Sequence, residues 1–400
     1  MDSYLPTLRQ NAFDRDHLIS IYFNLGFAYN EIATFFKKCH GIQLSVRHLK
    51  RVLKSKGLRR RIHKSHLEHV LNAVREELNG SGNSIGCRQM HRRMVIDHSL
   101  VIDKETVRII LKHLDPAGVE YRSRRTFRRK LYSTNGPNHL WHLDGYDKLK
   151  PFGFPVHRCI DGFSRRILWL QVAHSNNDPR VISSFYVSCI KEIKGVPRIL
   201  RGDRGTENVN VAGLQHFFRR DSSDDMAGNK SFLYGRSVSN QRIEAWWSFL
   251  RKSETDWWIR FFKDLIDSGH FDNSNPIHLD CMKFSFTGLI QDELTRIARH
   301  WNLHKIRLCA NTESLPGCPD VLYFLPQLHD TLDFKVAVPS DKLSIAEEIC
   351  CDFIPETGCS AEFQELANLI MEDESLQYPT TPDEGLILYF TLLQCIDNLV

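Results

Sequence analysis

The sequence predicts an α/β domain with a mixed five-stranded sheet flanked by helices, preceded by an all-helical region of helix-turn-helix character. Two observations support this fold class. The first 120 residues place apolar side chains at helical spacing between short turns, whereas from Pro137 short apolar runs typical of strands take over. Those runs then alternate with amphipathic helices, as in sheets covered by helices. With 400 residues, the chain is long enough for two or three domains.

The N-terminal segment predicts two helices, a Gly-containing turn between them, and a third, basic helix. Residues 14–35 have a helical apolar period that is broken at "NLG", and Ser45 is a candidate N-cap for the third helix. One face of this helix is apolar, and the opposite face carries Arg47, Lys50, Arg51 and Lys54. Nine Lys and Arg lie between Arg47 and Lys64, so we expect this helix to contact DNA in the major groove. The alternative is a small helical bundle with a solvated charged face.

A second helical unit follows, and then a basic linker. "SHLEHVLNAVREELNG" predicts a helix closed by Asn79-Gly80, and two further helices follow, the last starting at Asp103 or Lys104 and ending at Pro116-Ala117-Gly118. "YRSRRTFRRK" has six basic residues in ten and no apolar period. We expect its arginines to contact phosphates, with a solubilising hinge as the alternative; they are Arg124, Arg125, Arg128 and Arg129.

From Pro137 the predicted elements are three strands, then helix, strand, helix, strand and helix. "HLWHLDGYDKL" is the first strand, and "PVHRCIDGFSRRILWLQVA" is a hairpin around the turn "DGFSR". "PRVISSFYVSCIKEIKG" predicts a helix, and "VPRILRGD" a strand that ends in an acid. "VNVAGLQHFFRR", "KSFLYGRS" and "SNQRIEAWWSFLRKS" predict a helix, a short strand and a helix capped at Ser239.

Three acids stand out in these elements: Asp144 on the first strand, Asp203 just after the fourth strand and Glu244 one turn into the last helix. Between them lie 58 and then 40 residues, but adjacent strand ends and a facing helix could bring them together. A buried carboxylate without a partner costs several kcal/mol, and three crowded carboxylates repel one another. Two Mg²⁺ or Mn²⁺ ions would remove that penalty and support in-line phosphoryl transfer. We therefore predict that these three acids are both catalytic residues and metal ligands.

Four motifs resemble those of a known superfamily: "WHLDGYDKL", "CIDGFSRRILWL", "RGDRGTEN" and "SNQRIEAWW". They are similar to the core motifs of retroviral-type integrases and DDE transposases, and more closely to transposon-derived integrase core domain-containing proteins. The resemblance covers roughly residues 15–325 and implies a ribonuclease H-like fold, DNA integration activity, multimers, and a catalytic triad at the same three acids. The interval from Asp203 to Glu244 is longer than in retroviral integrases, and their zinc-binding N-terminal module is absent.

Other residues near the motifs have competing interpretations. Asp161 lies in the hairpin turn, where an aspartate commonly caps its own backbone. Asp147 and Glu207 could support the key acids, and Glu207 is better explained as a cap or ion-pair partner. Arg251 would share a helix face with Glu244, seven residues before it, and the resemblance implies DNA contact there; an exposed charge is the alternative.

The charge is distributed very unevenly along the chain. Residues 327–400 hold fifteen Asp and Glu against two Lys and Arg, a net charge of −13, so residues 1–326 carry about +18 of the total of +5. A body this basic attracts DNA, whereas an acidic tail is typically solvated, or masks or recruits a basic surface. Eleven scattered cysteines and no apolar N-terminal run predict a nuclear or cytoplasmic protein that is not secreted and does not enter a membrane.

These shifts divide the chain into six predicted segments. They are a helix-turn-helix domain (1–62), a second helical domain (63–120), a basic linker (121–136), the catalytic core (137–260), a helical extension (261–326) and the acidic region (327–400). The function expected is metal-dependent DNA cleavage and strand transfer. The alternatives are a domesticated DNA-binding protein that keeps the fold without catalysis, and a hydrolytic nuclease of the same fold.

Overall fold

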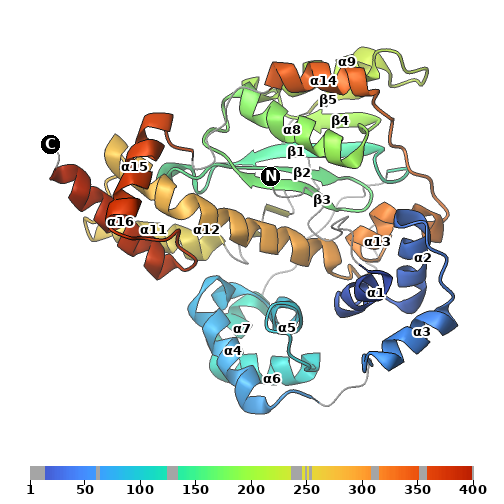
Figure 1. The fold of residues 1–400 in the computed structure, drawn as a ribbon, viewed down its shortest axis with the longest axis horizontal. Helices are drawn as coiled ribbons and strands as arrows, with labels where there is room; N and C mark the ends of the chain where they lie inside the picture. The colour runs from blue at the N-terminus through green and yellow to red at the C-terminus, as the bar shows by residue number, and fades with distance from the viewer. Residues whose placement is uncertain are drawn as a thin grey trace.

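The computed structural model describes residues 14–59, 64–123, 134–235, 246–247, 250–251, 255–307, 315–350 and 358–398. A central sheet is covered by helices on both sides, and the N-terminal helices lie beyond one of these layers (Figure 1). Within the described residues no helix is both long and apolar enough to cross a membrane.

The sheet has five strands in the order β3-β2-β1-β4-β5. β1 pairs with β2, and β2 with β3, in antiparallel fashion, whereas β1, β4 and β5 run parallel. The tight turn after Asp161 joins β2 to β3, which confirms the predicted hairpin. The mixed five-stranded sheet is consistent with the expected ribonuclease H-like fold. The strands are β1 (Leu140–Tyr146), β2 (Val156–Asp161), β3 (Ile167–Val172), β4 (Ile199–Gly202) and β5 (Phe232–Tyr234).

Each face of the sheet is buried by its own helical layer. Alternate side chains of β1 point to opposite faces of the sheet: Trp141 and Leu143 pack in one apolar core, and Tyr146 packs in the other. The first core is closed by α8 (Pro179–Ile193), α9 (Val209–Arg219) and α14 (Ser340–Cys350). The second core is closed by α11 (Asp256–Asp267), α12 (Pro276–Leu303), α15 (Ala361–Asp373) and α16 (Pro382–Asp397).

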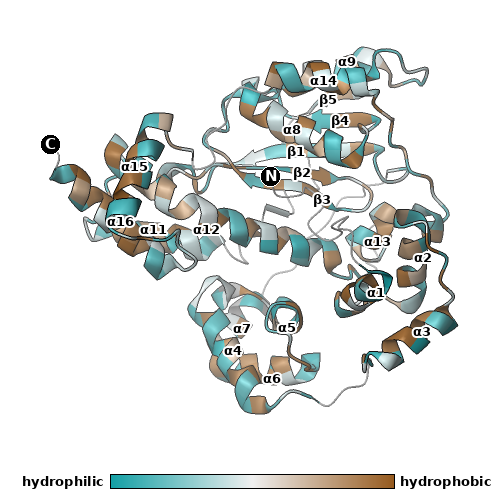
Figure 2. Ribbon diagram, in the orientation of Figure 1, coloured by the Kyte–Doolittle hydropathy of each residue, from teal (hydrophilic) through white to brown (hydrophobic). Residues whose placement is uncertain are grey.

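In the described part of the chain before the sheet, seven α-helices form two separate apolar cores. Most of them carry apolar and polar residues along their length, as Figure 2 shows, and their apolar sides meet inside each unit. The first unit contains α1 (Arg15–Asn24), α2 (Tyr29–Cys39) and α3 (Val46–Ser55); the second contains α4 (Leu67–Asn79), α5 (Cys87–Ile96), α6 (Lys104–Leu114) and α7 (Pro116–Ser123). The predicted caps are present, because Ser45 accepts from the His48 N–H and Asp103 accepts from the Thr106 N–H.

Buried ion pairs and ring contacts fix these two units to the rest of the molecule. α13 (Pro319–Phe324) bridges the first unit and the sheet: Asp320 pairs with Arg166 at the start of β3, and the Phe324 ring lies 6.2 Å from that of Phe35. The second unit lies against α12 through Arg93, which is 1% exposed and contacts Glu77 and Glu293. Both helical units are therefore packed on the helices that cover the sheet.

Three features differ from the sequence-based expectations. Pro116 starts a helix instead of ending one, because Asp115 accepts a hydrogen bond from the Gly118 N–H and proline is favoured in the first turn of a helix. This helix, α7, ends at Ser123, inside the predicted linker. Residues 327–400 are not a solvated tail, since α14 packs on α8 while α15 and α16 pack on α12. α16 was not expected, although Thr381 and Glu384 form a capping box at its start.

Candidate functional site

Asp144 and Asp203 lie side by side at one end of the sheet. β1 and β4 are parallel neighbours, and their last register pair is His142 with Arg201. Asp144 is two residues beyond His142, and Asp203 is two residues beyond Arg201 and one residue past the end of β4, so the same register continued by two residues would place the two acids opposite each other. Neighbouring strands are about 4.8 Å apart, and side chains at equivalent positions point to the same face. The fold thus brings together two of the three predicted acids.

The loop after β4 holds Asp203 and adds another acid. Asp203 Oδ1 accepts hydrogen bonds from the Gly205 N–H, at 3.1 Å, and from Asn208 Nδ2, at 2.8 Å. Asn208 Nδ2 also lies 3.2 Å from Glu207 Oε1. Burial raises the pKa of Glu207, and the negative charges of Asp203 and Asp147 raise it further. Carboxylates gathered in this way attract a cation, and their oxygen-only donor set suits a hard ion such as Mg²⁺ or Mn²⁺.

Asp144 has a hydrogen-bond partner that the sequence did not reveal. The indole Nε1 of Trp247 donates to Asp144 Oδ2 at 2.8 Å. Trp247 is 7% exposed and stacks on Tyr146 with ring centroids 4.9 Å apart. Sequence reasoning expected one of the paired tryptophans in the core and the other stacking or packing elsewhere, but Trp246 and Trp247 are both buried.

A buried arginine lies next to this pair. Arg158 is 0% exposed, occupies the β2 position opposite Asp144, and places its guanidinium 4.0 Å from the Trp246 ring and 4.6 Å from the Trp247 ring. Sequence reasoning passed over Arg158. Its position in the sequence could have revealed its role, because a charged residue inside the apolar run "VHRCI" needs a specific partner when the strand is buried.

The third predicted acid, Glu244, lies outside the described residues, so its position relative to the other two is not part of this site. Across the described ranges, no group of three or more His, Cys, Asp or Glu side chains is arranged to hold a metal ion. Trp247, three residues after Glu244 in the sequence, is described and contacts Asp144. The described part of the site is therefore an acid pair with its hydrogen-bond partners.

The competing acids have structural roles. Asp161 Oδ2 accepts from the N–H and the hydroxyl of Ser164, at 2.7 and 2.6 Å, and Oδ1 accepts from the Asn138 N–H at 2.8 Å. Asp161 therefore caps the hairpin turn, as its position in the turn suggested. Burial raises its pKa to about 6. Asp147 accepts a hydrogen bond from Asn176 Nδ2 at 2.9 Å.

The predicted DNA-contacting residues divide into three groups. The four cationic residues of α3 are all exposed, and one of them, Lys50, lies 5.1 Å from the Tyr29 ring. Arg251 is exposed and pairs with Asp256 at 3.3 Å, and this exposure is common to the predicted DNA contact and to its alternative, a solvated charge. The remaining four lie outside the described residues: Arg124, Arg125, Arg128 and Arg129.

Comparison with known families gives one match. Residues 131–325 match the model of the integrase core domain family. This span holds the whole five-stranded sheet, both described acids and α13, and it extends beyond the predicted core boundaries of 137 and 260. No curated protein matches the chain.

Proposed function

Residues 131–325 of this chain match the integrase core domain family, and from that premise we propose that the protein cuts DNA and joins DNA strands in a metal-dependent reaction. One observation supports the proposal: β1 and β4 are adjacent parallel strands inside the matched domain, and Asp144 and Asp203 each follow their last register pair by two residues. Two carboxylates placed this way repel each other unless a cation or a proton lies between them. DNA is the expected substrate, because integrase core domains act on DNA and residues 1–326 are strongly basic.

The residues that would hold the metal are Asp144, Asp203 and Glu244, with Mg²⁺ or Mn²⁺ as the ion, two per site. When bound, such a pair supplies electrostatic stabilisation to the attacking and leaving oxygens of phosphoryl transfer. The protein's own contribution is orientation. Trp247 fixes the Asp144 carboxylate through one oxygen, and the Gly205 N–H and Asn208 fix that of Asp203.

DNA binding is assigned to surfaces outside the acid pair. The exposed basic face of α3, on a unit packed against α13, offers the arrangement in which a helix enters the major groove. Arg251, four residues after Trp247 and seven after Glu244, adds an exposed guanidinium. The basic linker arginines would contact phosphates between these two regions.

The test is a DNA cleavage and joining assay with purified full-length protein, Mn²⁺ and labelled DNA ends. Asp203→Asn keeps the shape of the side chain but removes its charge, so we expect activity to be lost while DNA binding is unchanged. Asp225→Asn is the matched control, because Asp225 is exposed and lies away from the acid pair, and it should retain activity. Strong DNA binding without metal-dependent activity on any terminal sequence would contradict the proposal. Equal nicking by Asp203→Asn would identify a contaminating nuclease.

A further inference from the structure

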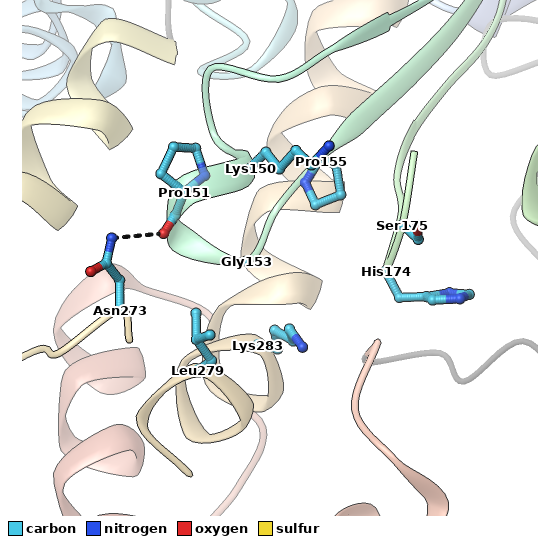
Figure 3. Close-up of a pocket in the computed structure, with 9 residues that line it drawn as sticks. All are labelled: Lys150, Pro151, Gly153, Pro155, His174, Ser175, Asn273, Leu279 and Lys283. Atoms are coloured by element: carbon cyan, nitrogen blue, oxygen red, sulfur yellow. Dashed lines mark hydrogen bonds between the residues drawn. The ribbon is translucent and has the colours of Figure 1, made fainter. Parts of the chain in front are cut away.

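A cavity of about 410 Å³ opens beside the sheet, and its lining combines two lysines and three polar side chains with Leu279 and two prolines. Its walls are the turn after β1, which contains the 3-10 helix η2 (Lys150–Phe152), the loop after β3, and the first turns of α12 with the segment before them. In Figure 3, Lys150 lies on the wall formed by the turn, Lys283 lies on α12, and His174 and Ser175 lie on the third wall. None of these residues was singled out by the sequence.

The two lysines keep hydrogen-bonding capacity for a ligand. Lys150 donates to Asn177 Oδ1 at 3.3 Å, and its Nζ is 3.8 Å from Asp147. Lys283 donates to Asp280 at 3.1 Å. An ammonium group has three N–H donors, so each lysine retains at least one that no residue in the described ranges takes up. An anion is the ligand that two such groups on facing walls would attract.

The backbone around the cavity is shaped to admit these side chains. Gly153 has φ of +97°, and a Cβ there would lie 3.1 Å from Lys283 Cγ, so the turn lets the lysine stem pass closely. Asn273 Nδ2 donates to the Pro151 carbonyl at 3.3 Å, which ties the α12 wall to the turn. His174 Nδ1 is buried without a hydrogen-bond partner among the described residues, and burial lowers the pKa of its ring. The third wall therefore offers a neutral polar group.

The cavity lies at the same end of the sheet as the acid pair. Tyr146 at the end of β1 pairs with Val156, and Val156 pairs with Val172, so the loops after β1 and β3 emerge beside each other. α12 covers the face of the sheet on which Trp247 is buried.

We propose that Lys150 and Lys283 bind one backbone phosphate of a DNA strand whose reacting phosphodiester lies over Asp144 and Asp203. This inference rests on the proposed function, and it adds a contact to another phosphate of the reacting strand. A phosphate at this position would fix the register of the strand over the acids, and it carries no information about base sequence.

The experiment measures binding of labelled DNA by full-length protein in EDTA, so that no turnover occurs, over a range of salt concentrations. Each lost phosphate contact should reduce the slope of log affinity against log salt by about 0.7 for a single strand or 0.9 for a duplex. We expect this reduction for Lys150→Ala and for Lys283→Ala, and roughly twice as much for the double variant. Lys263→Ala, an exposed lysine on α11, is the control and should keep the wild-type slope.

Wild-type slopes in all three cavity variants would overturn the proposal. Because Lys150 is exposed at the surface, Lys150→Ala should fold normally, and it decides the question even if Lys283→Ala does not fold. The cleavage assay is read separately. Reduced slopes in an enzyme that never cuts would leave the phosphate site intact and remove the catalytic role, whereas unchanged slopes in an active enzyme would remove only the phosphate site.

Discussion

Replacing Trp247 with phenylalanine removes the indole N–H that contacts Asp144 and retains an aromatic ring. The phenylalanine ring can still stack on Tyr146, whose ring centroid is 4.9 Å from that of Trp247. It can also still contact Arg158, whose guanidinium carbon lies 4.6 Å from the centre of the Trp247 ring. The lost bond is 2.8 Å long and ends on a carboxylate. The variant therefore isolates one charge-assisted hydrogen bond at the acid pair.

Hydrogen bonds to charged groups contribute about 1.5–3 kcal/mol. Asp144 is only half-buried, so the lower end of that range applies, and we expect Trp247→Phe to lower the free energy of unfolding by about 1.5 kcal/mol more than a matched change. Removing a group that orients a metal-binding carboxylate typically costs 10–100-fold in metal affinity or activity. The Mn²⁺ concentration needed for half-maximal cleavage should rise by a factor in that range.

Trp258→Phe is the matched control. Trp258 is 5% exposed, belongs to the same apolar core, and has an Nε1 with no hydrogen-bond partner among the described residues. Both substitutions remove the same atoms from one core, so their common packing loss cancels. Urea unfolding followed by circular dichroism gives the stability difference, and cleavage against Mn²⁺ concentration gives the metal requirement. Equal effects of the two substitutions would refute the orienting role of Trp247.

Three further outcomes are expected. Burial raises the pKa of Asp161 in the folded protein to about 6, so the folded protein holds a proton that the unfolded chain releases. The free energy of unfolding, relative to that of Asp161→Asn, should therefore fall by roughly 3 kcal/mol as the pH rises from about 4 to 6. A difference between the two proteins in urea unfolding that does not change with pH would contradict this. Arg93→Met should destabilise the fold by about 3–5 kcal/mol in the same assay, because the partly or fully buried carboxylates of Glu77 and Glu293 would lose their guanidinium partner. A loss of less than 1 kcal/mol would contradict the importance of this network. Arg51→Ala should reduce the salt slope of DNA binding by about 0.9 while Arg15→Ala on α1 does not, and equal slopes would exclude α3 as the DNA-contacting helix.

Much of the fold follows from patterns that act over short stretches of chain. The hairpin around Asp161 and the helix starting after Ser45 were predictable, because turn and cap residues hydrogen-bond to their own neighbouring backbone. The start of α7 at Pro116 was missed although Asp115 provides the cap, since an Asp-Pro-Ala-Gly run also fits a turn. Local signals can thus support more than one structure.

The acidic region shows the limit of composition. Its net charge of −13 predicts a solvated tail, but its charged residues lie on the outer faces of helices whose inner faces are apolar. Ala346 of α14 and Leu388 of α16 are 0% and 2% exposed in the two cores of the sheet. Charge alone therefore did not decide whether this region packs, because burial depends on which residues share a helix face.

The sequence by itself determined the order of the five strands and of the helices between them, the basic face of the third helix, and the two acids on or just after core strands. Those properties depend on side-chain periodicity and on neighbouring residues. Only the tertiary structure decided that β4 pairs with β1, which places Asp203 beside Asp144, and that Trp247 reaches Asp144 from a distant segment. It also brought Lys283 of α12 against the turn after β1. Contacts between residues so far apart in the sequence are set by how the layers pack, and no local pattern specifies them.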